Sequence, residues 1–159
     1  MAAVDYFLKI DGVPGESLDN HHPNEIDVES WSWGESNSAE AGPGRGAAGK
    51  VDIQDFHFTS RISKASPALM LACASGKHIK SAVLTARKAG GAQAEFLVIK
   101  FSDVIVSSVQ TSGSSDMVPM DSTSLGFSKI EVEYRETKPD GTLGASTVFG
   151  WDLKKNKKL

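Results

Sequence analysis

The sequence has few of the features that would place it outside the ordinary globular proteins. Its 159 residues include a single cysteine, Cys73, so no intrachain disulfide can form. No apolar run approaches the roughly 18 residues that a membrane-spanning helix requires, and the start, MAAVDYFLKIDG, lacks the basic and apolar regions of a signal peptide. The net charge of -3 provides no general attraction to nucleic acid. We therefore expect no disulfide scaffold, no membrane span, no signal-directed export and no nucleic-acid partner.

The composition that remains is that of one domain covering residues 1–159. Hydrophobic residues make up 40% of the chain and charged residues 23%, which is typical of a protein with its own core. Most of the chain has the alternating pattern of half-buried strands. Strands are predicted at 4–10, 26–34, 51–59, 78–88, 93–101, 104–111, 124–136 and 146–153, with a polar loop at 112–122.

Two of these runs change their buried face partway along. In IDVESWSWG, Ile26 and Val28 fall on one face, but Trp31 and Trp33 fall on the other. The run VDIQDFHFT makes a second switch after Ile53. A β-bulge, or burial on both faces, would explain such a switch.

The segment GPGRGAAGKV, residues 42–51, contains two overlapping nucleotide-binding patterns. Gly44, Gly46 and Gly49 fit G-x-G-x-x-G, and the G-K pair at 49–50 completes a P-loop core. Both patterns need a helix after the loop, whose N-terminus would hold phosphate. The residues after Lys50 have the pattern of a strand, and Val51 lacks the hydroxyl that would bind Mg²⁺. We therefore expect no nucleotide cofactor, and interpret 36–50 as a long exposed loop.

One helix is predicted, in SKASPALMLACASGKH. Ser66 fits the N-cap, Pro67 the first helical position, and Gly76 the position after the end. The apolar residues Ala68, Leu69, Leu71, Ala72 and Cys73 would form the buried face. A helix this short needs a sheet to pack against.

The remaining turns favour antiparallel pairing. Gly90-Gly91 suits a two-residue hairpin between 78–88 and 93–101, and KPDG at 138–141 suits a second turn. Short strands, hairpins and one helix predict a mainly β fold: an antiparallel β-barrel of two packed sheets with one flanking α-helix.

Candidate catalytic and metal-binding residues are few. Cys73, Ser75 and His78 lie close together, but Cys73 falls on the apolar face of the helix, and no oxyanion loop surrounds the three. Asp19, His21 and His22 lack the spacing that closes a metal site, so we interpret their segment as an ordinary surface loop. No enzyme, metal or cofactor is predicted.

Two charged segments remain without an assigned chemistry. In the strand at 124–136, the alternating charges predict one wet face, which consists of Lys129, Glu131, Glu133 and Arg135. The basic tail at 154–159, KKNKKL after Leu153, is interpreted as a solvated, frayed end.

Several segments together resemble the haemolysin-coregulated protein (Hcp) family of bacterial type VI secretion. They are DYFLKIDGVPGES, IDVESWSWG, VDIQDFHFT, SKASPALMLACASGKHI, AVLTARKAGG and LGFSKIEVEYRE, in this order, between about Val4 and Trp151. The resemblance implies a tube subunit without catalysis. Six copies would form a ring, and rings would stack into a tube. A contractile sheath would expel the tube from the cytoplasm without a signal peptide, with effectors in the lumen and a spike protein at the tip.

In such a tube, the glycine-rich loop could reach the neighbouring ring. The candidate stacking residues are Glu40, Gly42, Gly44, Arg45, Gly46, Gly49 and Lys50, and the charged residues 129–135 are candidates for a solvated lumen or ring face. Two other functions stay open at this point: a monomeric ligand-binding module, for example for sugars through Trp31 and Trp33, and an enzyme acting through Cys73.

Overall fold

The protein is a mainly antiparallel β structure with one helix. A computed structural model describes residues 3–38, 50–91 and 93–159. The elements are β1 (Val4–Ile10), β2 (Ile26–Asp27), β3 (Ser30–Ser32), β4 (Glu35–Asn37), β5 (Val51–Ile53), β6 (Phe56–Arg61), α1 (Ala65–Ser75), β7 (His78–Lys88), β8 (Glu95–Ser114), β9 (Met117–Gly126), β10 (Lys129–Thr137), β11 (Leu143–Asp152) and β12 (Lys157–Lys158).

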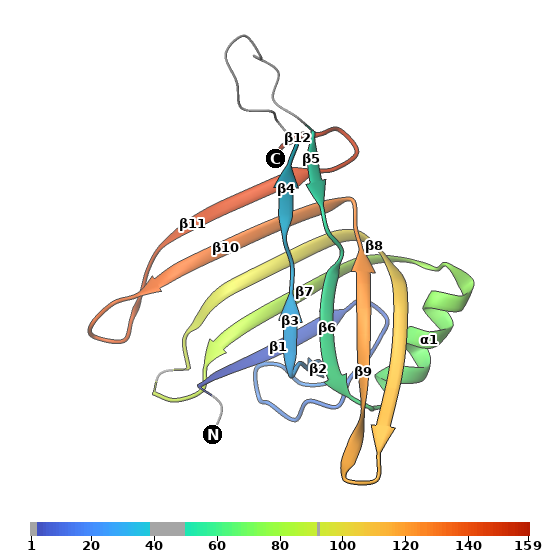
Figure 1. Ribbon diagram of the computed structural model, residues 1–159. Coiled ribbons are helices and arrows are strands. Elements are labelled where there is room, and N and C mark those ends of the chain that lie inside the picture. Colours follow the sequence, from blue (N-terminus) through green and yellow to red (C-terminus); the bar gives the residue numbers. More distant parts are fainter. Residues whose placement is uncertain (1–2, 39–49, 92) are drawn as a thin grey trace.

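The strands form two layers that share one strand, β8 (Figure 1). The first layer has the order β12-β11-β10-β8-β7-β1-β2, and the second has the order β3-β6-β9-β8. Up to Ile105, β8 pairs with β7, and from Ile105 onward it pairs with β9. The two packed sheets and the helix are as predicted. The hydrogen-bonded order of the described strands, however, has edges at β12, β2 and β3 and does not form a closed barrel.

The core lies between the layers and is built from alternate residues of each strand. Phe56 and Phe58 of β6 are at most 1% exposed, and the Phe56 ring lies 4.8 Å from that of Phe101 on β8. Leu8 of β1 and Leu84 of β7 are fully buried and belong to the first layer, on the other side of the core. Phe56 and Phe58 are two positions apart, as the alternating pattern of a half-buried strand requires.

The two changes of buried face mark points where the chain changes its strand partner. Ile26 pairs with β1 in the first layer, whereas Trp31 pairs with Phe58 in the second. Likewise, β5 pairs only with β4, and β6 pairs with β3 and β9. A chain that changes sheets must also change which side of it is buried.

The helix ends as predicted but begins earlier. Gly76 has a φ of 64° and donates its N–H to the carbonyls of the last turn, as a left-handed C-cap does. The N-cap is Lys64, not Ser66. The Ser66 hydroxyl instead donates to the buried carboxylate of Asp121 on β9. Tertiary contact thus replaced the local cap that the sequence predicted.

The buried side of α1 is also narrower than predicted. Leu69 and Ala72 belong to the core, and Cys73 packs partly against it. Leu71, which we expected on the apolar face, is 69% exposed. Small residues such as alanine, serine and cysteine lie on several sides of this short helix. The sequence pattern therefore does not define which side of the helix is buried.

Three predicted connections differ in the structure. The 89–94 connection is longer than a two-residue turn, because the N–H of Lys88 pairs with the carbonyl of Ala94. Residues 112–122, predicted to be a loop, form the end of β8, a turn at 115–116 and most of β9. The predicted strand 124–136 is interrupted at 127–128. Most polar side chains in 112–122 face solvent, so the composition of this segment resembles that of a loop.

The basic tail is not frayed. Lys157 and Lys158 form β12, which pairs with Asp152 and Trp151 of β11, and the N–H of Leu159 donates to the carbonyl of Gly150. The tail folds back because Asn156 adopts a positive φ of 52°, which reverses the chain.

The two leucines of α1 provide a matched test of how the helix packs. Leu69→Ala should cost roughly 2–5 kcal/mol, because it leaves a cavity in the core. Leu71→Ala, on the exposed side of the same helix, should change stability by less than about 0.5 kcal/mol. Urea unfolding followed by circular dichroism measures both, and equal losses for the two variants would contradict the described helix orientation.

Candidate functional surfaces

The glycine-rich segment connects two strands that form a separate two-stranded ribbon, hydrogen-bonded to neither layer in the described part of the chain. Its two strands are β4 and β5, which pair Glu35 with Ile53 and Asn37 with Val51 (Figure 1). Lys50 is exposed at the start of β5. The chain after Lys50 is therefore a strand, which confirms that neither nucleotide-binding pattern has the helix that it needs. The other proposed loop residues, Glu40, Gly42, Gly44, Arg45, Gly46 and Gly49, lie outside the described residues.

The charged residues of β10 lie on the outer face of the first layer. Ile130, between Lys129 and Glu131, is fully buried in the core, so its two neighbours face the opposite way. Glu131 is opposite Lys100 of β8. Glu133 and Arg135 continue the same outward row, as alternation along a strand requires.

The outer face of the second layer has a different chemistry that the sequence analysis did not single out. The registers align one row, Ser32, His57, Ser124 and Ser108, beside a second row, Ser30, Thr59, Ser122 and Gln110. Hydrogen bonds join neighbours within it: Ser30 Oγ lies 2.6 Å from Thr59 Oγ1, and Ser124 Oγ lies 2.5 Å from His57 Nδ1. We call these eight residues the hydroxyl face.

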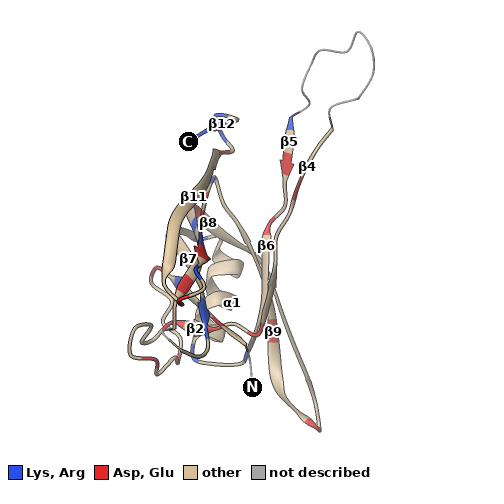
Figure 2. Cartoon of the chain, turned by 90° about the vertical axis from the view of Figure 1, so that its left-hand side faces the viewer, with Lys and Arg blue, Asp and Glu red and all other residues tan. Residues whose placement is uncertain are grey.

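Charge is nearly absent from this layer. Asp121, the only charged residue of β9, points into the core, where its carboxylate also accepts a hydrogen bond of 2.8 Å from Thr111. Arg61, at the end of β6, is the charged residue of that strand. Seen edge-on in Figure 2, β6 and β9 form a mostly tan layer, whereas the β12 end of the other layer is blue. The two outer surfaces therefore offer different environments to a partner.

Several large apolar side chains are exposed at the margins of the layers. Met117 and Val118 near the β8–β9 turn are 65% and 53% exposed, and Val148 on β11 is 64% exposed. Val118 and Ile62 line a shallow hollow of about 300 Å³ beside β2. Together with the unpaired edge of β3 and the part of β11 that β12 does not pair with, these residues are the kind of surface that a second chain covers.

No catalytic arrangement connects Cys73, Ser75 and His78. The Ser75 hydroxyl donates to the carbonyl of Leu71 at 2.8 Å, and His78 Nδ1 lies 3.1 Å from the Asp103 carboxylate. Each of these polar groups therefore has a structural partner, while Cys73 packs against the core. Within the described parts of the chain, no group of three or more His, Cys, Asp or Glu side chains could hold a metal ion.

Asp103 instead organises the end of the molecule near the tail. It accepts hydrogen bonds from Lys154 Nζ at 3.0 Å and from the Ser128 hydroxyl at 3.0 Å. The hydrogen bonds from Lys154, His78 and Ser128 lower the pKa of Asp103 to about 2. The group fastens the tail to the bend in β8, where Asp103 has a φ of 54°.

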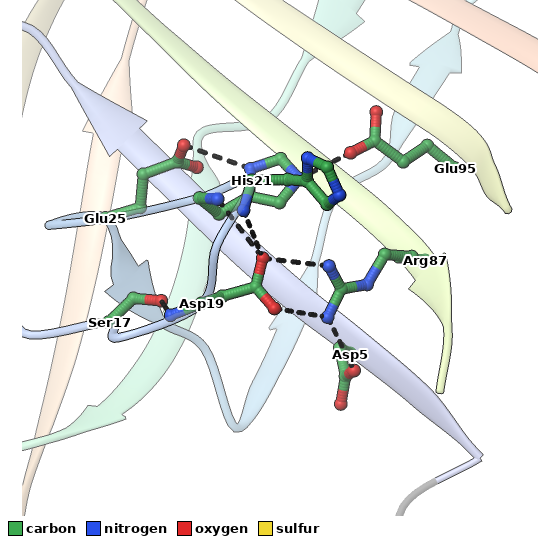
Figure 3. Close-up of polar contacts among 8 residues, drawn as sticks. Asp5, Ser17, Asp19, His21, Glu25, Arg87 and Glu95 are labelled. Atoms are coloured by element: carbon green, nitrogen blue, oxygen red, sulfur yellow. Dashed lines mark hydrogen bonds and ion pairs between the residues drawn. The ribbon is translucent and has the colours of Figure 1, made fainter. Parts of the chain in front are cut away.

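The segment 11–25, which we expected to be an ordinary surface loop, is anchored by a polar cluster (Figure 3). The Arg87 guanidinium of β7 donates to both carboxylate oxygens of Asp19, at 2.9 and 2.8 Å, and to Asp5 of β1 at 3.3 Å. Arg87 is only 3% exposed. Its hydrogen bonds hold the pKa of Asp19 well below the usual range. Because Asp19 and Arg87 are 68 positions apart, no local pattern could reveal this pair.

His22, the other anchor of this segment, is also buried. Its ring stacks on Phe7 of β1 with centroids 4.5 Å apart, and its two nitrogens face Glu25 and Glu95. Burial alone lowers the pKa of His22, but the hydrogen bonds to Glu95 and Glu25 outweigh it and raise the pKa. The histidine is thus a member of a structural ion-pair cluster with Glu25 and Glu95.

The tryptophans proposed for sugar binding are not an open platform. Trp31 packs edge-on against Tyr6 and stacks with Phe56, with ring centroids 5.9 and 6.0 Å apart. Trp33 is also partly buried against the core. Sugar-binding aromatic rings present a free face, so this packing disfavours the ligand-binding module.

No helix in the described part of the chain is long and apolar enough to cross a membrane.

The model of the family described as "Type VI secretion system effector, Hcp" matches residues 7–134. The chain is 47% identical over 158 residues to "Protein hcp1" of Pseudomonas aeruginosa, and this alignment covers 97% of this chain and 98% of that protein.

Solved structures agree over the whole length. The crystal structure of Hcp1 from Salmonella typhimurium is 38% identical with a TM-score of 0.82, covering 99% of this chain and 100% of the other. A structure described as a type six secretion system protein gives a TM-score of 0.93 at 29% identity, with the same coverage of both chains. The family comprises structural tube proteins and not enzymes. The chain therefore belongs to the Hcp family of type VI secretion.

Proposed function

We propose that this chain is the structural subunit of a type VI secretion tube, in which six copies form a ring and rings stack into a tube. A contractile sheath expels the tube from the bacterial cytoplasm. Effector proteins lie in the lumen, and a spike protein sits at the tip. The observation that carries this proposal is the match over nearly the full length to Hcp proteins.

The margins of the subunit support lateral assembly. The unpaired strand edges and the exposed Met117, Val118 and Val148 lie at different places on the molecule. A contact between two different patches is heterologous, and it gives a ring when its rotation closes. Covering apolar side chains on association contributes roughly 25 cal/mol per Å² of apolar area, so these residues favour association.

The hydroxyl face is suited to line the lumen. Its side chains are polar and uncharged apart from the titratable His57, and they offer neither apolar anchors nor a field of one sign. Cargo would therefore be held weakly and independently of its own charge. The charged row Lys129, Glu131, Glu133 and Arg135 then faces outward on the ring, where charge keeps the assembly soluble.

The ring itself is the first test. The purified protein should be a hexamer by size-exclusion chromatography with light scattering, and its melting temperature should rise with protein concentration, because the interfaces form only between folded subunits. A monomer at tens of micromolar in moderate salt would contradict the proposal.

The orientation of the two faces can be tested in stacked tubes with single cysteines. In a Cys73→Ala background, Ser122→Cys on the hydroxyl face and Glu131→Cys on β10 should both react with a small maleimide. A maleimide on a polymer too large for the lumen should label only Glu131→Cys. Equal labelling of both sites by the large reagent in intact tubes would place the hydroxyl face outside.

The glycine-rich loop is proposed to contact the next ring, since Lys50 is exposed at its base and Glu40 and Arg45 offer charges beyond it. Replacing residues 41–48 by Gly-Ser should leave rings and circular dichroism intact but weaken stacking. Arg45→Glu should weaken stacking in the same direction, more at low salt, because exposed charges are screened within about 10 Å at 0.1 M.

Negative-stain microscopy counts tubes, and light scattering measures rings. Lys138→Glu, in the β10–β11 turn, is the matched control for a lost surface cation. Rings that dissociate when the loop is shortened would place the loop in the lateral interface, and normal tubes would leave it without a stacking role.

A further inference from the structure

The segment 11–25 is held on the first layer by two anchors of different chemistry. At one anchor, Arg87 binds Asp19 through two hydrogen bonds of 2.9 and 2.8 Å. At the other, His22 lies between Glu25 of the same segment and Glu95 at the start of β8. Both anchors pack on Phe7, which is only 5% exposed: the His22 ring stacks on the Phe7 ring with centroids 4.5 Å apart, and the Arg87 guanidinium lies 4.9 Å from the ring centre.

The His22 anchor has its full set of hydrogen bonds only when the ring is protonated. Nδ1 lies 3.0 Å from a Glu25 oxygen, and Nε2 lies 2.5 Å from a Glu95 oxygen. Both partners are carboxylates, so both ring nitrogens must donate. A neutral imidazole carries one N–H, and its other nitrogen would then present a lone pair to a carboxylate oxygen at close range.

The charged groups around His22 come from every element packed against it. Glu25 and Asp19 belong to the segment itself, and the backbone N–H of His22 donates to Asp19 at 3.2 Å. Glu95 comes from β8. Arg87 of β7 lies 4.9 Å from the centre of the same Phe7 ring on which His22 stacks, and it is neutralised by Asp19 and by Asp5 of β1. The surroundings of the His22 ring are thus predominantly acidic.

We propose that segment 11–25 is a pH-sensitive clasp, in which protonated His22 fastens residues 20–25 over Phe7 and loss of that proton releases them. The Asp19–Arg87 pair keeps its charges at neutral and alkaline pH, so it acts as the fixed end. This device belongs to the folded subunit and does not depend on the tube function proposed above.

The direction of the pH response follows from the two states of His22. Its pKa is raised in the closed clasp by the hydrogen bonds to Glu95 and Glu25, which exceed the opposing effect of burial. The stabilisation is therefore complete below about 6.5, the pKa of an exposed histidine, and is lost as pH rises through the higher closed-state value. Each pKa unit of difference corresponds to about a tenfold change in the closing equilibrium.

Hydrogen exchange on the intact protein can follow the clasp directly. The N–H of Asn24, which donates to the carbonyl of Ser17 at 2.9 Å, reports on residues 20–25. After correction for intrinsic exchange, its protection should be constant up to about pH 6.5. By pH 9 it should have fallen roughly tenfold for each unit by which the pKa of His22 in the closed clasp exceeds that of an exposed histidine. Peptides from β7 and β10 should show no such step.

Three variants separate the clasp from a merely structural loop. Glu95→Gln removes one acidic partner and should move the midpoint of the step to lower pH. His22→Gln should abolish the step. His21→Gln, which removes the neighbouring histidine side chain but keeps the backbone N–H that binds Asp19, should leave the midpoint unchanged.

If His22→Gln does not fold, the Glu95→Gln titration still decides the question, and NMR titration of the His22 ring gives its pKa independently. Equal protection of Asn24 at pH 6 and pH 9 in the unmodified protein would overturn the proposal. A midpoint that Glu95→Gln does not move would overturn it too.

Discussion

The sharing of β8 between two sheets is the constraint on which the rest of the fold depends. One strand of 20 residues pairs with β7 and β10 along its first half and with β9 along its second. Between the halves, Asp103 takes a left-handed conformation that an aspartate adopts at modest cost, and its side chain fastens the C-terminal tail. The two layers and the C-terminal tail therefore meet at this one bend.

Local sequence signals predicted what local physics determines. The alternating pattern predicted β1 and β7 with the observed bounds, and Gly76 fixed the end of the helix because a left-handed residue was required there. The start of the helix was wrong because the Ser66 hydroxyl binds Asp121, 55 positions away. Likewise, the polar composition of 112–122 predicted a loop. Its many serine side chains are typical of loops, and nothing in the sequence indicates that these residues pair as strands.

The candidate functional surfaces also include features that the sequence predicted and features that it did not. The absence of a helix after the glycine-rich segment was readable from Val51 onward, so the nucleotide interpretation could be rejected without coordinates. The polar cluster around Arg87 was not readable, because His22 and Glu95 are 73 positions apart and meet only through the pairing of β7 with β1 and β8. The resemblance to the Hcp family was visible in the sequence through the combination of many ordinary segments and not through any single motif.

The hydroxyl face has a mechanical consequence. Serine and threonine have one side-chain torsion to restrict, so little conformational entropy is lost or regained as another surface moves across them. Part of their hydrogen-bonding capacity is already used between neighbours, as in the Ser30–Thr59 and Ser124–His57 pairs. A molecule sliding along such a surface would meet many shallow and similar energy minima instead of a few deep ones. If this face lines the lumen, as proposed above, passing cargo would therefore meet little resistance from it.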